Sequence, residues 1–226
     1  MILVGDCEEV LASCDDSTID CVVTSPPYYQ PDFKRTDTEV LGLEPTLDAY
    51  CESICNCFRG VHHVLKDQGM MFVILGGACS VPWHVALSLQ ADGWWLQRDL
   101  VWQRPPRLNR PHEYIFLFTP HDQMIDLPAY RKRHDLVETI PSVWAFDETE
   151  DVTINLDAFQ TLPDELLEQC IAYGSCRGDT ILDPFAGAGT TGRMAHLMGR
   201  NFLGIEINPL YASLAEQNLQ IKQWYQ

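Results

Sequence analysis

The sequence predicts an α/β fold, in which helices cover both faces of a mainly parallel sheet. Short apolar runs rich in β-branched residues alternate along the chain with segments of helical periodicity, as in parallel sheets connected by helices. Two apolar runs near the middle are separated by only about ten residues, so we expect this pair to be antiparallel. A length of 226 residues suits one sizeable domain, and we expect residues 1–226 to form a single unit.

The first half of the chain divides into alternating strands and helices. Apolar runs predict strands at 1–4, 19–24 and 70–75. Helical spacing predicts helices at 8–11, from Thr46 or Asp48 to about Leu65, and at 81–90. We expect Lys66–Gly69 to end the long helix as a turn. Residues 29–46 have little apolar periodicity and predict a loop of a length that is usually functional or mobile.

The second half continues this alternation after an irregular segment. Strands are predicted at 94–103, 114–119, 180–183 and 201–206. Helices are predicted from Pro163 to about Ala172 and at 190–198 and 209–220, with Pro163 in a first turn. From 120 to 160 the chain carries several prolines, many charges and weak periodicity. We interpret this part as an irregular excursion and not as a second domain.

The chain is strongly acidic, with 32 Asp and Glu against 15 Lys and Arg and a net charge of −17. Such a charge repels nucleic acid at long range. It fits either adaptation to a salty cytoplasm or an ordinary acidic protein. The cations cluster near Trp94, Trp95 and Trp102, so a phosphate backbone would find a favourable field only there. The candidate phosphate contacts are Arg104, Arg107, Arg110, Arg131 and Arg133.

The sequence disfavours both a membrane or secreted protein and a metal-binding protein. No apolar stretch approaches the roughly 20 residues that span a bilayer, and no charged-then-apolar signal opens the chain, so we expect a cytoplasmic protein without a membrane partner. Nine Cys in such a chain predict free or buried thiols. Cys51, Cys55 and Cys57 precede His62 and His63, but they lie in a helical segment without a CxxC pair, so we expect no metal site.

The stretch Thr24–Tyr28 (TSPPY) follows a predicted buried strand. Neither proline can donate to a strand ladder, so the backbone must leave the sheet in a stiff, extended turn. Its carbonyls then point outward beside the aromatic ring of Tyr28. This arrangement suits a planar molecule that carries an NH₂ group, although an isolated Pro-Pro-Tyr is more often a plain turn.

A second motif, residues 181–191 (ILDPFAGAGTT), runs from a strand through a glycine-bearing turn into a helix. Glycines let a ligand approach the backbone, and a helix amino terminus offers free N–H groups. Asp183 would repel phosphate but suits an ammonium group. Glu206, 23 residues later at the end of the next strand, stands where a carboxylate binds ribose hydroxyls. A nucleoside joined to an amino acid without phosphate is S-adenosyl-L-methionine.

The two motifs together resemble the β class of amino-group DNA methyltransferases, in its TSPPY subgroup. The segments GDCEEVL, HEYIFLFTP and FLGIEINPLYASLA also resemble the family, so the resemblance covers most of the chain. It implies a Rossmann-like S-adenosyl-L-methionine-dependent fold, a restriction-modification context and double-stranded DNA as partner. It also implies that the excursion at about 104–160 contains a short target-recognition segment. Many relatives dimerise, which leaves a homodimer open.

The resemblance implies a role for each matching residue. The turn that holds the target base is formed by Ser25, Pro26, Pro27 and Tyr28. The methionine part of the cofactor is lined by Asp183, Pro184, Phe185, Gly187, Gly189 and Thr190. Glu206 would bind the ribose, Asp6 and Cys7 would lie near the adenine, and Thr161 would close over the methionine end. The run Leu156–Phe159 departs from the His-containing run that the subgroup usually has before Pro163.

The target base follows from the residue at position 25. The family more often has Ser there for cytosine and Asp or Asn for adenine, so we favour cytosine-N4 over adenine-N6 methylation. RNA and protein glutamine methylation are more remote, since those families usually have Asn at this position. Carbon-5 methylation needs a Cys nucleophile, normally after Pro, and the chain has no Pro-Cys pair. A non-catalytic DNA- or cofactor-binding protein is the remaining alternative.

Overall fold

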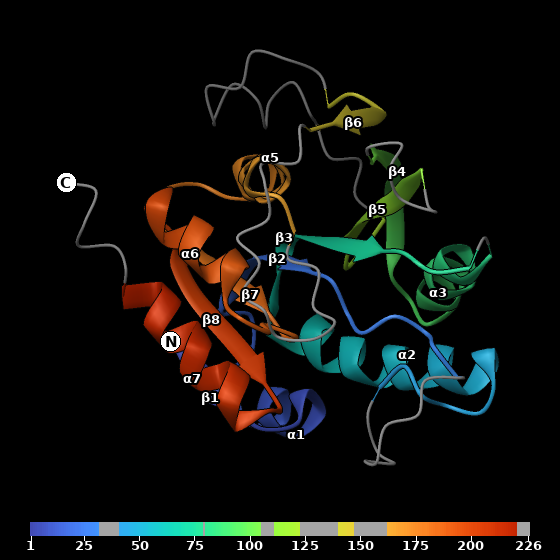
Figure 1. Cartoon of the computed structure of the whole chain (residues 1–226), viewed down its shortest axis with the longest axis horizontal. Coiled ribbons are helices and arrows are strands. Elements are labelled where there is room, and N and C mark those ends of the chain that lie inside the picture. Colours follow the sequence, from blue (N-terminus) through green and yellow to red (C-terminus); the bar gives the residue numbers. More distant parts are fainter. Residues whose placement is uncertain (32–40, 79, 105–110, 123–139, 147–161, 221–226) are drawn as a thin grey trace.

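The structure is a computed structural model that describes residues 1–226 except 32–40, 79, 105–110, 123–139, 147–161 and 221–226 (Figure 1). Its described strands form one sheet in the order β1-β8-β7-β2-β3-β5-β4-β6. The strands are β1 (Ile2–Val4), β2 (Ile19–Thr24), β3 (Leu65–Leu75), β4 (Trp95–Gln103), β5 (His112–Thr119), β6 (Val143–Ala145), β7 (Thr180–Asp183) and β8 (Asn201–Glu206). The helices are α1 (Cys7–Ala12), α2 (Leu47–Val64), α3 (Val81–Ala91), α5 (Asp164–Gly174), α6 (Thr190–Leu197) and α7 (Pro209–Gln220).

The sheet is parallel throughout except at β5, which runs antiparallel to both β3 and β4. The prediction of a mainly parallel sheet with one antiparallel hairpin strand is therefore confirmed. Because β5 is reversed, its amino end lies at the edge of the sheet where the other strands have their carboxyl ends. This edge consequently collects side chains from the start of β5 as well as from the ends of β2, β7 and β8.

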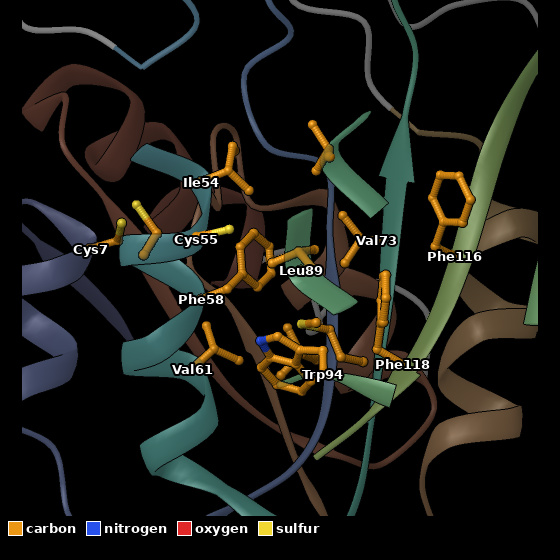
Figure 2. Close-up of a cluster of buried hydrophobic side chains, with 14 of the residues drawn as sticks. Cys7, Ile54, Cys55, Phe58, Val61, Val73, Leu89, Trp94, Phe116 and Phe118 are labelled. Carbon is orange, nitrogen blue, oxygen red and sulfur yellow. The ribbon is translucent and has the colours of Figure 1, made fainter. Parts of the chain in front are cut away.

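Helices cover both faces of the sheet, and each face has its own apolar core (Figure 1). Helices α1, α2 and α3 pack on one face, and α5, α6 and α7 pack on the other. Figure 2 shows the first core, where Phe58 of α2 points toward Val73 of β3 and Phe118 of β5. Phe58 is fully buried, and burial of such a side chain stabilises the fold by about 1.5–3 kcal/mol.

The helices agree closely with the periodicity of the sequence. Helix α2 begins after Thr46, whose hydroxyl accepts the N–H of Ala49 at 3.2 Å as an N-cap. Cys51, Cys55 and Cys57, which the sequence disfavoured as metal ligands, are buried on α2 with free thiols. Among the helices described, none combines the length and apolar content that a bilayer crossing requires.

Two predicted segments differ from the structure. The expected turn at Lys66–Gly69 lies inside β3, because Ile19 pairs with Leu65 while Cys21 already pairs with Met70. Six positions of β3 (65–70) therefore face only three of β2 (19–21), and the polar residues bulge within a continuous strand. The prediction of an irregular excursion is wrong at β6, which pairs parallel with β4 and buries Trp144 against Tyr173. This strand is as short as β1, and its apolar residues stand within a segment of prolines and charges that gives no periodic signal.

The connection between β4 and β5 is closed at its base. The N–H of Arg104, directly after β4, donates to the carbonyl of Pro111 at 2.9 Å. The ladder continues from this point with Gln103 opposite His112. The two ends of the connection therefore lie side by side.

Candidate active site

The two motifs of the sequence meet at the carboxyl ends of the adjacent strands β2 and β7. The register pairs Cys21 with Ile181 and Val22 with Leu182, which brings the ends of the two strands together. The hydroxyl of Thr24 donates to Oδ1 of Asp183 at 2.7 Å, and both side chains are buried. One hydrogen bond thus joins residues that are 159 positions apart in the sequence.

The carboxylate of Asp183 lies at the centre of this junction. It accepts hydrogen bonds from Thr24, from the side chain of Thr191 and, at 3.1 Å, from the backbone N–H of Phe185. Burial raises the pKa of Asp183 to about 6, although these three hydrogen bonds act to lower it. A buried carboxylate favours a cation beside it. The contribution of Thr191 was not predicted from the sequence.

The two glycines of the turn have different environments. Both have positive φ, +51° at Gly187 and +81° at Gly189. A Cβ on Gly187 would meet nothing within 4 Å, whereas one on Gly189 would lie 2.8 Å from Cβ of Ala215 on α7. Close packing against α7 therefore explains the glycine at 189. The open space above Gly187 leaves room for a ligand to approach the backbone.

Two further carboxylates lie beside this turn, at the ends of β8 and β1. Glu206 accepts the N–H of Gly187 at 2.9 Å and that of Asn208 at 2.8 Å, which fixes its orientation. Asp6 is the N-cap of α1 and accepts the N–H of Glu8 at 2.8 Å. The N–H of Gly5 donates to the backbone carbonyl of Glu206 at 3.1 Å, so the ends of β1 and β8 are tied together.

The structure brings most of the predicted cofactor residues to one edge of the sheet. Pro184 is buried directly after β7, Thr190 begins α6, and Cys7 is buried at the start of α1. The other members at this edge are Asp6, Asp183, Phe185, Gly187, Gly189 and Glu206. Thr161 lies outside the described residues.

The Ser-Pro-Pro-Tyr turn leaves β2 at the same edge. Its Pro27 carbonyl accepts the hydroxyl of Tyr50, a fully buried residue of α2, at 2.8 Å. One of the outward carbonyls expected from the sequence is therefore already used within the protein. Tyr50 was not identified from the sequence, because its helical spacing reads as an ordinary core position.

The ring of Tyr28 is held on two sides. Its hydroxyl donates to Oε2 of Glu113 at 2.7 Å and accepts from the hydroxyl of Ser25 at 3.4 Å. Burial, followed by the nearby Glu113 carboxylate, raises the pKa of Tyr28, so the phenol stays protonated as a donor. A Cβ on Gly76, just after β3, would lie 2.5 Å from Cε2 of this ring.

The placement of Arg104 differs from the prediction of a phosphate contact. Its guanidinium donates to Oε1 of Glu113 at 2.7 Å and lies 5.0 Å from the centre of the Trp102 ring. The side chains of Arg104 and Glu113 are 8% and 2% exposed. The prediction that Arg104 contacts a DNA phosphate is therefore wrong, because this buried ion pair withdraws the cation from the surface. The other candidate DNA contacts, Arg107, Arg110, Arg131 and Arg133, lie outside the described residues.

We predict that Gly76→Ala displaces the ring of Tyr28 and reduces methyl transfer at least tenfold, with little loss of stability. The new methyl group would approach Cε2 at 2.5 Å and the Glu113 carboxylate at 3.0 Å, so the ring must move. Steady-state rates and a thermal melt measure both effects.

Gly93→Ala is the matched control for Gly76→Ala, since its Cβ would meet nothing within 4 Å. Because φ is +110° at Gly93, the control carries backbone strain without the ring contact. An unchanged rate in Gly76→Ala would contradict this account.

Comparisons with known proteins agree with this geometry. Residues 19–217 match the model of the DNA methylase family N6_N4_Mtase. The chain is 30% identical to the Type II methyltransferase M.SmaI of Serratia marcescens, over 96% of this chain and 90% of that protein. It is also 30% identical to the Type II methyltransferase M.XycI of Xanthomonas campestris pv. cyanopsidis, over 96% of this chain and 86% of the relative.

Solved structures show the same fold. A candidate DNA modification methylase from Thermus thermophilus, in complex with S-adenosyl-L-methionine, superposes with a TM-score of 0.76 at 24% identity. That match covers 100% of this chain and 95% of the other. The PvuII DNA methyltransferase, described as cytosine-N4-specific, gives a TM-score of 0.76 at 21% identity, over 96% of this chain and 85% of its own.

The family match and the Type II relatives decide the assignment, and the predicted resemblance to amino-group DNA methyltransferases is confirmed. S-adenosyl-L-methionine is the methyl donor of this class of enzyme. The chain belongs to the N6_N4_Mtase family of DNA methylases and is an S-adenosyl-L-methionine-dependent DNA amino-methyltransferase.

Proposed function

We propose that the protein methylates the exocyclic N4 amino group of cytosine at a specific site in double-stranded DNA. The observation that carries this proposal is the side-chain hydrogen bond between Thr24 and Asp183. It places the turn that would hold an amino group against the turn that would hold a methyl donor. Adenine-N6 methylation is the alternative, because the amino group of adenine could occupy the same turn.

The described residues fit the cofactor. The buried carboxylate of Asp183 would attract its ammonium group, and the space above Gly187 would admit its methionine part. Glu206, oriented by two backbone N–H groups, would accept from the ribose hydroxyls, and Asp6 and Cys7 would lie beside the adenine. When bound, S-adenosyl-L-methionine supplies a methyl group on a positively charged sulfur.

The turn after β2 would hold the acceptor. An aromatic NH₂ is a poor nucleophile because its lone pair is delocalised into the ring. Hydrogen bonds from that group to the Ser25 hydroxyl and the Pro26 carbonyl would favour a pyramidal nitrogen and free the lone pair. Tyr28 would stack on the base, which must be swung out of the duplex to reach the site. The protein's contribution is then chiefly positioning.

The choice of cytosine rests on Ser25. A neutral hydroxyl at this position is the family's more frequent choice for cytosine, and Ser25 is half-buried beside Tyr28. For the DNA backbone we keep Arg107, Arg110, Arg131 and Arg133 as candidate contacts. Each such contact would release counterions and make binding salt-dependent.

The proposal predicts N4-methylcytosine as the product. Unmethylated DNA would be incubated with the protein and labelled S-adenosyl-L-methionine over a range of salt concentrations, digested, and analysed by nucleoside mass spectrometry. Modification-aware sequencing of the same DNA would give the recognition site. N6-methyladenine would replace the cytosine assignment by its alternative. Absence of transfer at every salt concentration, with cofactor binding intact, would contradict both.

A further inference from the structure

A line of four side chains runs inward from the proposed acceptor turn. In order these are Ser25, Tyr28, Glu113 and Arg104. We propose that Glu113 is a positioning residue that fixes the hydrogen-bond direction of this line, so that the Ser25 oxygen can only accept a hydrogen bond from the target base. The inference rests on the proposed function, in which Ser25 receives an N–H of the target amino group.

The direction of the line follows from what each group can donate. Arg104 has only donors, and the carboxylate of Glu113 has only acceptors. Oε1 of Glu113 accepts from Arg104 and Oε2 accepts from the hydroxyl of Tyr28, each at 2.7 Å. The single phenol proton of Tyr28 is therefore committed to Glu113.

Tyr28 transmits this hydrogen-bond direction to Ser25. With its proton committed, the Tyr28 oxygen can only accept from Ser25, whose hydroxyl approaches it at 3.4 Å. The single hydroxyl proton of Ser25 then points inward, and its lone pairs are left for the ligand. Such a hydroxyl matches the N–H of cytosine or adenine and mismatches the carbonyl of thymine or guanine. Glu113 would thus select cytosine or adenine, whose amino groups stand where thymine and guanine carry a carbonyl, without touching the base.

The surroundings keep the line in place. Glu113 reaches this edge only because β5 is antiparallel, which brings it to Tyr28 across 85 positions of sequence. Glu113 is 3% exposed and Arg104 is 9% exposed. The absence of a side chain at Gly76 allows the Tyr28 ring and the Glu113 carboxylate to lie against the same stretch of backbone.

Glu113→Gln is the sharpest test, because it keeps the shape of the side chain and reverses the direction of the line. The amide oxygen must face the donor Arg104, so the amide NH₂ faces Tyr28. The phenol proton then turns toward Ser25, whose own proton turns toward the substrate N–H. Two donors would meet at the reacting nitrogen. We expect kcat to fall by about tenfold to hundredfold, with unchanged affinity for S-adenosyl-L-methionine and an unchanged KM for DNA.

Tyr28→Phe separates this mechanism from simple damage. Phenylalanine removes the hydroxyl that transmits the direction, so Ser25 is free to rotate and the loss should be smaller. In the double variant Tyr28→Phe/Glu113→Gln, the reversal can no longer reach Ser25. The double variant is therefore expected to be faster than Glu113→Gln alone, a non-additive result that only a coupled line produces. Asp92→Asn, which changes an acid paired with the exposed Arg59, is the matched control and should leave kcat unchanged.

These measurements distinguish a failure of the Glu113 inference from a failure of the proposed function. If the wild-type protein forms N4-methylcytosine in DNA but the losses of the two single variants add in the double variant, the directional role of Glu113 is overturned and the proposed function stands. The same holds if Glu113→Gln acts only by lowering the melting temperature or the affinity for S-adenosyl-L-methionine. If the wild-type protein transfers no methyl group to any DNA amino group, the proposed function and this inference fall together.

Discussion

Asp183→Asn is expected to weaken the binding of S-adenosyl-L-methionine by about tenfold to hundredfold, the range for loss of a charged hydrogen-bond partner. Asparagine preserves the shape of the side chain but removes the buried negative charge that would attract the ammonium group of the cofactor. Isothermal titration gives the affinity directly. Methyl transfer at low cofactor concentration should fall in proportion.

The pH dependence of binding is part of the same prediction. Because the pKa of Asp183 is about 6, lowering the pH through 6 protonates the carboxyl group, and the affinity of the wild-type protein for the cofactor should fall. Asp183→Asn should lack this dependence. Asp164→Asn, which alters a half-exposed partner of Arg193, is the matched control and should retain it. Equal cofactor affinity in wild type and Asp183→Asn would exclude Asp183 from the cofactor site.

Protein stability should respond to pH in the opposite sense. The pKa of Asp183 is raised in the folded state, so the folded protein holds this proton more tightly than the unfolded chain. The contribution of this group to stability is therefore largest below pH 4 and is lost as the pH rises toward 6. The shift corresponds to about 3 kcal/mol, and denaturant titrations of wild type and Asp183→Asn in this window would isolate it.

Arg104→Ala is expected to destabilise the fold by about 3–5 kcal/mol, the largest stability effect that we predict for a single substitution. The substitution leaves the carboxylate of Glu113, only 2% exposed, without the cation it is paired with. In a protein of this size the melting temperature should fall by roughly 10 °C. Thermal and urea unfolding of the purified variant measure the change.

The exposed ion pair between Arg59 and Asp92 provides the control for Arg104. The side chain of Arg59 is 60% exposed, so Arg59→Ala should leave the melting temperature almost unchanged. Arg104→Ala/Glu113→Ala should recover part of the loss, since it removes the orphaned charge as well. A melting temperature for Arg104→Ala equal to that of Arg59→Ala would show that burial of the pair does not matter.

The central part of the candidate site could be predicted from the sequence because its signals are local. Thr24 and Asp183 each end a short apolar run, and strand ends meet at one edge of a parallel sheet. Gly187 and Glu206 were found for the same reason. The sequence did not separate Gly187 from Gly189, because the close approach of Ala215 depends on where α7 packs.

The remaining site residues depend on contacts that no local pattern reports. Glu113 and Gly76 acquire their places only when β5 folds back beside β3, and Tyr50 looks like any other apolar position of α2. The prediction for Arg104 was wrong because the sequence shows a cluster of cations but not that Glu113, nine positions away, pairs with one of them. Charge counted along a chain does not reveal which charges are buried together.

The backbone hydrogen bond between Arg104 and Pro111 also bears on how much the connection between β4 and β5 could vary. The two ends of the connection are fixed next to each other, so the length and content of the chain between them can vary without shifting the register of β4 and β5. Glu113, two residues beyond Pro111, would stay in place through such changes. The fold therefore offers a point at which this connection could be lengthened or exchanged, by evolution or by design, while the edge that carries the candidate site is kept.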